Sequence, residues 1–306
     1  MKSGCVQKSF FGCSFIFLFL AVIIVMMWIS SQLPEINFST NDQSKREYQI
    51  EVDTTINEKV IKSLFTWQFV DNSLRKRSYK LSLMLLEKDV IEAMKYVEEI
   101  SSMSYRELGL KRGYSDPVME SQIVWAEIYR RIFIDSSPRM ETVLQGLNKI
   151  FLEENFEIRD KVYFVITFIQ NIKYERPGGT LDLFPPPGTL AYRFGDCDSK
   201  ALLLYVILEK IGVDCAMMWS YKYKHAMLGV CINSRGEYLI VNGKKYYFLE
   251  TTYPQWSIGD LPPEFGNTKF WFISEIDADL KFSASDEINI RKDELKNRIK
   301  PSPSVP

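Results

Sequence analysis

The feature that most constrains the fold is an apolar run that begins directly after the sequence RFGD. From Cys197 onward, apolar side chains recur at helical spacing and occupy most of the circumference: Ala201, Leu202, Leu203, Leu204, Tyr205, Ile207, Leu208 and Ile211. Gly212 follows, and glycine is common just past the end of a helix. A helix that is apolar on nearly all sides has to be buried. We therefore predict a helix over 197–211 that other elements surround.

The segments on either side of this helix indicate an α+β fold. Runs rich in β-branched and aromatic residues predict four strands after the helix, at 213–220, 225–233, 238–241 and 245–251. Near the start of the domain, TWQFV (66–70) and RSYKLSLMLL (77–86) flank the turn-like sequence DNSLRK and predict a β-hairpin. The sequence thus predicts a helix packed on an antiparallel sheet, with a separate hairpin before it.

Residues 87–172, between the hairpin and the apolar helix, have helical periodicity. Asp116-Pro117 and Ser137-Pro138 each match a capping residue followed by proline at the first helical position, so both pairs predict helix starts. A further helix is predicted over 158–171. The sequence RPGGTLDLFPPPGT (176–189) contains too many glycines and prolines for a regular element. We expect it to form a wall of a binding cleft.

The N-terminal segment predicts a membrane anchor. Residues 10–29 carry no charge, and a helix of that length spans roughly 30 Å, the thickness of a bilayer core. Lys2 and Lys8 precede it, which favours a cytoplasmic N-terminus over 1–9. A cleaved signal peptide is the alternative, although no A-x-A site follows. The anchor implies a single-pass protein of the cell membrane, with the lipid bilayer as a partner and the C-terminal domain outside the cytoplasm.

Composition shifts set the remaining boundaries. The polar residues 30–47 contain Pro34 and no apolar period, so they predict a linker. The folded domain is predicted over 48–276, with a helical part at 87–172 and a core at 173–276. Residues 277–306 are rich in charge and predict a flexible tail.

Charge and residue counts exclude several classes of function. The 38 basic and 39 acidic residues give a formal net charge of -1, so no broad basic surface favours nucleic acid. The five cysteines, at positions 5, 13, 197, 215 and 231, have spacings that suggest neither a disulfide framework nor a zinc site. The single histidine, His225, excludes a metal site built on several imidazoles. We predict no metal and no cofactor.

Cys197 carries the strongest chemical signal. It falls on the first turn of the predicted helix, where unpaired N–H groups and the helix dipole favour an anion, so we expect a lowered thiol pKa. Asp196, directly before it, fits a capping residue. His225 is the only imidazole that can exchange a proton with this thiol. Glu250 would orient the imidazole if antiparallel strands place residue 225 opposite residue 250.

These residues carry a family resemblance. The order R-F-G-D-C, apolar helix, H-A-M-L-G-V and Y-Y-F-L-E-T-T resembles the transglutaminase-like superfamily, which has a papain-like cysteine enzyme fold. V-I-T-F-I-Q-N-I-K-Y (165–174) and P-G-T-L (187–190) resemble segments that precede the cysteine in a prokaryotic, membrane-anchored branch. The resemblance covers roughly residues 64–262. It implies Cys197 as the nucleophile, His225 as base and acid, and Glu250 at a third position that is most often aspartate.

The resemblance implies acyl transfer through a thioester. The substrate would be a carboxamide or peptide bond in a protein or peptide, and the product would depend on whether water or an amine accepts the acyl group. Trp256, in W-S-I-G-D-L-P, resembles a recurring segment and is a candidate substrate contact. Gln170 is a candidate oxyanion donor by residue type alone, and packing within its own helix is the other reading. The alternative function is a membrane-tethered binding or scaffolding module that keeps the fold without turnover.

Overall fold

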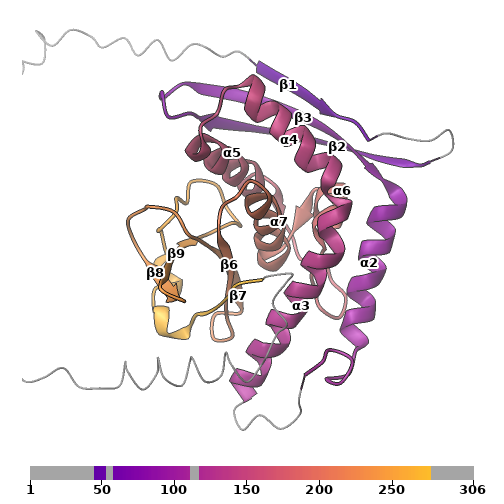
Figure 1. The fold of residues 1–306 in the computed structure, drawn as a ribbon, viewed down its shortest axis with the longest axis vertical. Coiled ribbons are helices and arrows are strands. Elements are labelled where there is room, and N and C mark those ends of the chain that lie inside the picture. The colour runs from indigo at the N-terminus through magenta and orange to yellow at the C-terminus, as the bar shows by residue number, and fades with distance from the viewer. Residues whose placement is uncertain (1–44, 53–57, 111–116, 277–306) are drawn as a thin grey trace, which may run out of the picture. The chain divides into compact units, whose positions relative to one another are not determined.

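The computed structural model of the protein describes residues 45–52, 58–110 and 117–276, which all belong to one compact unit (Figure 1). The predicted N-terminus (1–9), anchor (10–29) and tail (277–306), and most of the predicted linker, lie outside the described residues. Within the described ranges, no helix combines the length and the apolar character needed to cross a bilayer.

A three-stranded sheet opens the described part of the chain. β1 (Lys45–Ile50) pairs in parallel with β3 (Lys76–Leu86), which pairs antiparallel with β2 (Val60–Val70). The predicted hairpin is therefore confirmed. β1 starts inside the predicted linker, before the expected domain boundary at Tyr48. The sequence does not reveal this strand because its only partner, β3, is distant along the chain and the strand itself is mostly exposed.

The helices that follow agree with the predicted helical part of the domain, with the bounds α2 (Glu87–Ser102), α3 (Pro117–Arg139), α4 (Glu141–Glu153) and α5 (Ile158–Gln170). The predicted helix start at Ser137-Pro138 is wrong, because Pro138 lies in the last turn of α3. The N–H of Met140 bonds to the carbonyl of Ser136 at 3.1 Å, so the helical turn continues past the proline. Both Met140 and Ser136 are fully buried, which holds this turn in place.

Part of the segment 176–189, predicted to be irregular, is helical. α6 (Pro186–Tyr192) has Pro186 and Pro187 in its first turn, where a missing N–H costs no hydrogen bond. Gly188 is needed at the next position, because a Cβ there would lie 2.8 Å from Met94 Sδ. The prolines that suggested a loop thus serve as the start of a short helix packed on α2.

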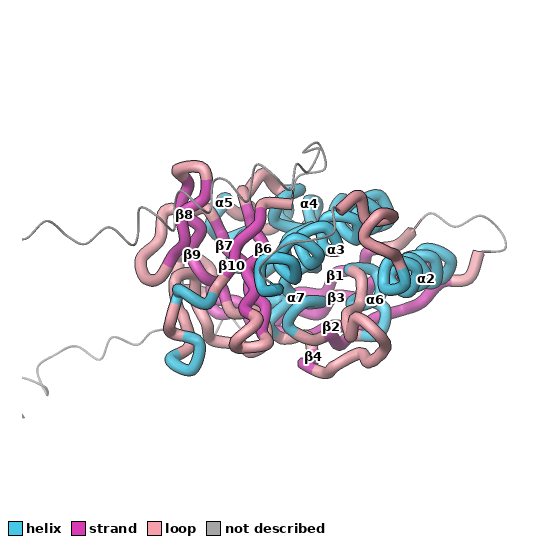
Figure 2. The backbone as a smooth tube through the Cα atoms, turned by 90° about the horizontal axis from the view of Figure 1, so that it is seen from below, coloured by secondary structure: helices cyan, strands magenta, loops and turns pink. Residues whose placement is uncertain are grey.

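The predicted central helix is confirmed as α7 (Cys197–Lys210), in which nearly every residue up to Leu208 is buried. α5 packs on one side of α7 and also on β2 of the N-terminal sheet. On the other side, α7 packs on the strands β6 (Cys215–Ser220) and β7 (His225–Val230). Figures 1 and 2 show the resulting layers, with α5 and α7 between the two sheets.

The C-terminal sheet has the order β10-β6-β7-β9-β8, and all its described pairs are antiparallel. Its remaining strands are β8 (Tyr238–Val241), β9 (Lys244–Leu249) and β10 (Phe272–Ser274). The four predicted strands are thus confirmed, and β10 is an addition. Two 3₁₀ turns, η1 (Pro263–Phe265) and η2 (Thr268–Phe270), precede β10. A pair of two-residue strands, β4 (Lys173–Tyr174) and β5 (Phe194–Gly195), lies parallel just before α7.

Candidate active site

Cys197 is the first residue of α7, and the local sequence explains how it is presented. The carboxylate of Asp196 caps the helix by accepting a hydrogen bond from the N–H of Ser199 at 2.9 Å, which confirms the predicted cap. Gly195 leaves room for this turn, because a Cβ there would lie 2.8 Å from the Cβ of Ser199. The thiol is 5% exposed and is therefore held at the buried start of the central helix.

The structure places Cys197 beside the start of β7, the strand that His225 opens. The N–H of Ala226 donates a hydrogen bond to the Cys197 sulfur, so the nucleophile candidate contacts the residue next to the only histidine. Cys197 and His225 also line one cavity of about 340 Å³. The packing of α7 on β7 therefore places the two residues at the same cavity.

His225 and Glu250 form a buried pair. The distance from His225 Nε2 to Glu250 Oε2 is 2.7 Å, and the Glu250 side chain is 2% exposed. Because a carboxylate only accepts hydrogen bonds, Nε2 carries the proton in the neutral ring and Nδ1 is left as the basic nitrogen. The ring stacks on Phe265 with centroids 4.5 Å apart, which fixes its plane.

The predicted strand register was wrong by two residues. Leu228 pairs with Leu249 and Val230 with Tyr247, which places residue 225 level with residue 252 instead of residue 250. A shift of two residues keeps the same face of the sheet, since side chains alternate with a period of two. Glu250 follows the last residue of β9 and still contacts His225 from the predicted side.

Two further donors hold the Glu250 carboxylate in its ionised form. Thr252 donates to Oε1 from its N–H at 2.7 Å and from its hydroxyl at 2.6 Å. Burial raises the pKa of Glu250, but the hydrogen bonds from His225 and Thr252 and the charge of His225 outweigh it. The pKa of Glu250 is therefore lowered, and Glu250 remains negative beside the imidazole.

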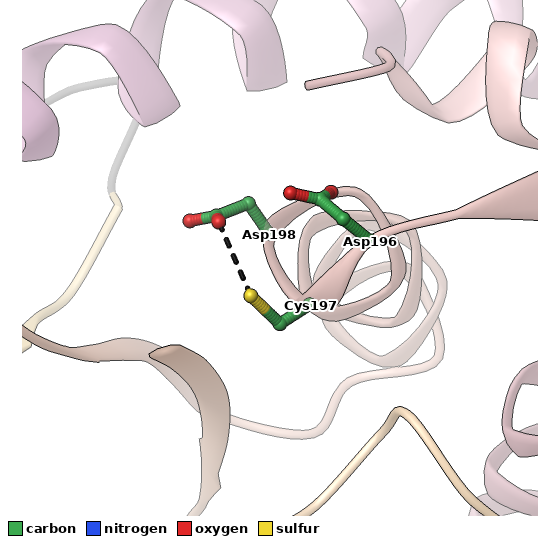
Figure 3. Close-up of side chains that lie close together, drawn as sticks. All are labelled: Asp196, Cys197 and Asp198. Atoms are coloured by element: carbon green, nitrogen blue, oxygen red, sulfur yellow. Dashed lines mark hydrogen bonds between the residues drawn. The ribbon is translucent and has the colours of Figure 1, made fainter. Parts of the chain in front are cut away.

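The electrostatic setting of Cys197 corrects the sequence prediction for its thiol. Burial raises the pKa of Cys197 well above its ordinary value, and the charges of Asp198 and Asp196 raise it further. The Asp198 carboxylate lies 3.4 Å from the sulfur and accepts a hydrogen bond from the thiol (Figure 3). It also accepts a hydrogen bond from the Tyr129 hydroxyl. The sequence prediction of a lowered pKa gave the helix dipole more weight than the neighbouring carboxylates. Desolvation and two neighbouring carboxylates exceed the effect of the dipole, and the resting group is a neutral thiol.

The structure separates two weaker candidates from the chemistry. Gln170 Nε2 donates to the carbonyls of Glu250 at 2.9 Å and Trp256 at 2.8 Å, so both amide hydrogens are used. Gln170 is thus neither an oxyanion donor nor a residue that packs only within its own helix. Trp256 is not among the residues that line the cavity beside Cys197. The Trp256 carbonyl accepts from Gln170, and this hydrogen bond helps to hold the loop that carries Glu250.

The cavity beside Cys197 has aromatic walls. Trp125, Tyr129 and Trp219 form a continuous group of rings, with centroids 5.5 Å and 5.7 Å apart. Arg176 and Asp182, from the glycine- and proline-rich segment, form another wall, as predicted from the sequence. The cavity therefore combines aromatic surface with many polar and charged groups.

Among the residues that the structure describes, Asp196, Cys197 and Asp198 form a cluster whose donor atoms lie within 4.8 Å of one another, as a metal site requires. Both carboxylates are already occupied, however, since Asp196 caps α7 and Asp198 accepts from Tyr129. These contacts explain the cluster without a metal ion.

Sequence reasoning missed several residues that shape the site, above all Tyr129, Thr252 and the buried Lys200. A lysine inside an otherwise apolar helix was the one visible signal.

Comparisons with protein-family models, curated proteins and solved structures give no match. The chemistry of the site therefore rests on its own geometry.

Proposed function

We propose that this protein is a transglutaminase-like cysteine enzyme with a papain-like core that transfers or hydrolyses acyl groups at carboxamide or peptide bonds. The observation that carries the proposal is the pairing of the only histidine with a buried, ionised glutamate beside the cavity that the Cys197 thiol also lines. A carboxylate that orients an imidazole next to a thiol is the arrangement that cysteine nucleophiles use.

In the proposed reaction the Cys197 thiol passes its proton to Nδ1 of His225 as the sulfur attacks the carbonyl carbon of the substrate. The electron pair of the carbonyl bond moves to the carbonyl oxygen. The N–H at the start of α7 is a candidate donor to this oxyanion. When the carbon–nitrogen bond breaks, the proton on Nδ1 passes to the leaving amine. The remaining thioester is cleaved by water or by a second amine, and the thiol is restored.

The raised pKa of Cys197 bears on how the proton moves. A resting thiolate would lie beside the Asp198 carboxylate in a buried site, which is unfavourable. The mechanism therefore requires His225 to remove the proton as the sulfur attacks, so that negative charge passes on to the carbonyl oxygen. Glu250 stabilises the imidazolium that forms in this step.

The test is acylation of the tag-free protein by an active ester such as p-nitrophenyl acetate, followed by mass spectrometry of the cysteine peptides. Cys231 provides an internal comparison, because it is a half-buried cysteine just after β7 that does not line the cavity of Cys197. We expect Cys197 to form a thioester at least about tenfold faster than Cys231 at pH 7, as general-base assistance gives. His225→Ala should remove this advantage. Equal labelling of both cysteines in the wild-type protein contradicts the proposal.

A second candidate is a binding module without turnover, favoured by the neutral, deeply buried thiol and the carboxylate beside it. The aromatic cavity would then serve recognition alone. The same labelling experiment separates the two candidates, since a module predicts that His225→Ala leaves the Cys197 labelling rate unchanged.

We also propose, from the sequence alone, that residues 10–29 anchor the domain in the cell membrane and that the domain lies outside the cytoplasm. Extraction of membranes with alkaline carbonate tests this proposal. The full chain should stay with the membrane, and a chain that lacks residues 1–30 should be released. Release of the full chain would contradict the anchor.

A further inference from the structure

Lys200 is a fully buried ammonium group three residues after Cys197 on α7. Lysine is rarely buried completely unless its charge is satisfied. Here the Nζ atom donates to three backbone carbonyls, of Gln170 at 3.2 Å, Ile172 at 2.7 Å and Thr252 at 2.9 Å. These partners account for all three of the ammonium hydrogens.

The three carbonyls belong to two segments, the end of α5 and the loop after β9. Gln170 is the last residue of α5, and Ile172 lies just beyond it, where helix carbonyls lack partners within the helix and a positive charge is favourable. Thr252 lies in the loop after β9. Lys200 therefore joins the helix that carries the nucleophile candidate to the loop that carries Glu250.

The hydrogen bond from Lys200 to Thr252 connects Lys200 to His225 and Glu250. The same residue that offers its carbonyl to Lys200 donates twice to Glu250 Oε1, and the other carboxylate oxygen bonds to His225. Gln170 Nε2 holds the carbonyl of Glu250 itself. The segment 250–252 is thus fixed on both sides of the carboxylate by buried side chains.

Lys200 and Glu250 also interact through their charges. Burial lowers the pKa of Lys200 to about 7, and the negative charge of Glu250 opposes this lowering. The negative charge of Glu250 therefore favours the protonated form of Lys200, in which all three hydrogen bonds to the carbonyls can form.

We propose that Lys200 is a positioning residue, whose three hydrogen bonds hold the Thr252 peptide and, through Thr252, the Glu250 carboxylate against Nε2 of His225. The functional meaning of this role rests on the proposed function, because His225 and Glu250 serve a reaction only if Cys197 is a nucleophile. The geometric role can be measured without any turnover.

The single histidine makes the measurement direct, because every imidazole signal in a tag-free protein belongs to His225. The proton between Nε2 and the Glu250 carboxylate should give a downfield proton NMR resonance that exchanges slowly with water. A residue that only stabilises the fold changes the melting temperature and leaves this resonance in place. A positioning residue changes its exchange rate in the folded protein.

The decisive variant is Lys200→Met, which keeps the unbranched shape and removes the donors and the charge. We expect the His225 ring proton to exchange at least about tenfold faster than in the wild-type protein, with the far-UV circular dichroism unchanged. Glu250→Gln serves as the reference for complete loss of the bond. Lys210→Met is the matched control, because Lys210 is exposed at the end of the same helix, and its exchange rate should equal that of the wild type.

An unchanged exchange rate in folded Lys200→Met overturns the proposal. If that variant does not fold, Lys200→Gln replaces it, because a glutamine is one bond shorter and offers two donors instead of three. A smaller increase in exchange is then expected, and a wild-type rate in Lys200→Gln again overturns the proposal.

Labelling of Cys197 distinguishes this proposal from the proposed function. If both hold, Lys200→Met lowers the rate of thioester formation as well as the protection of the ring proton. If His225→Ala labels Cys197 as fast as the wild type while Lys200→Met still loses protection, the positioning role stands and the enzymatic function fails.

Discussion

Replacement of Glu250 by glutamine should invert the protonation of the His225 ring. Glu250 accepts from His225 through one oxygen and from Thr252 through the other. A glutamine keeps only one acceptor oxygen, and the N–H of Thr252 cannot act as anything but a donor. If that oxygen stays with Thr252, the amide NH₂ faces Nε2 of His225, which must give up its proton. Nδ1 then carries the proton and cannot act as the base.

The size of the effect follows from the two arrangements open to the amide. If the amide oxygen turned to His225, the buried N–H of Thr252 would lose its acceptor at a cost of about 1–3 kcal/mol. Inversion of the ring avoids this cost, so we expect it to prevail. Loss of a positioned base slows proton transfer about 10²–10⁴-fold, which equals about 2.7–5.4 kcal/mol of activation free energy. The folded structure should survive the exchange.

Active-ester acylation of Cys197 at pH 7 measures this loss, and Glu264→Gln is the control. Glu264 is an exposed glutamate beside Phe265, so the control makes the same chemical change near the His225 ring without touching the pair. The difference between Glu250→Gln and wild type should shrink at high pH, where hydroxide removes the thiol proton directly. An acylation rate in Glu250→Gln within about twofold of the wild-type rate at pH 7 would refute the base role.

Further outcomes follow from other charges in the structure. Asp198→Asn should move the pH profile of Cys197 alkylation by iodoacetamide to lower pH, because it removes a negative charge 3.4 Å from the sulfur; an unmoved profile contradicts this. Glu154→Ala should destabilise the domain to urea by about 3–5 kcal/mol, because it leaves the buried Arg77 without its carboxylate. The pKa of Glu250 is lowered from 4.5 in the folded protein, so its stabilisation is present above pH 4.5 and is lost as pH falls below it. Urea unfolding of Glu250→Gln should therefore depend less steeply on pH in that acidic range than unfolding of the wild type.

The parts of the fold that could be predicted are the helices and strands whose apolar residues recur with a regular spacing along the sequence. α7 and the strands β6, β7 and β9 have the patterns of a buried helix and largely buried strands. A turn such as Asn242-Gly243 fixes the hairpin of β8 and β9 locally. The order Cys197, His225, Glu250 was accessible for the same reason, because each residue sits at a boundary of one of these elements.

Long-range contacts account for what was missed. β1 depends on a parallel partner, β3, which is the second strand of the following hairpin. The two-residue error in register at Glu250 arose because no local pattern fixes which residues of β7 and β9 face each other. Lys200 illustrates the same limit. Its three carbonyl partners lie between 28 and 52 residues away along the chain, and nothing near position 200 indicates them.

The direction of the pKa shift of Cys197 shows a further limit of sequence-based prediction, because the shift is the sum of the effects of all neighbouring groups. The start of a helix favours a thiolate, but this influence is worth only about 0.3–1 kcal/mol at an exposed site. Burial and the nearby Asp198 carboxylate act against it within a few ångströms. Asp198 was visible in the sequence, yet the direction of its side chain toward the sulfur was not.

The two carboxylates of the site act in opposite directions because of what each one contacts. Glu250 accepts from His225 and stabilises a positive ring, whereas Asp198 faces the sulfur and destabilises a negative one. A resting thiolate–imidazolium pair would gain from the first and lose from the second. In the proposed mechanism this conflict ends when the sulfur bonds to carbon, since its charge then moves to the substrate oxygen while the ring keeps the contact with Glu250. Asp198→Asn should therefore speed alkylation of the resting thiol more than it speeds acyl transfer, in which the charge has already left the sulfur.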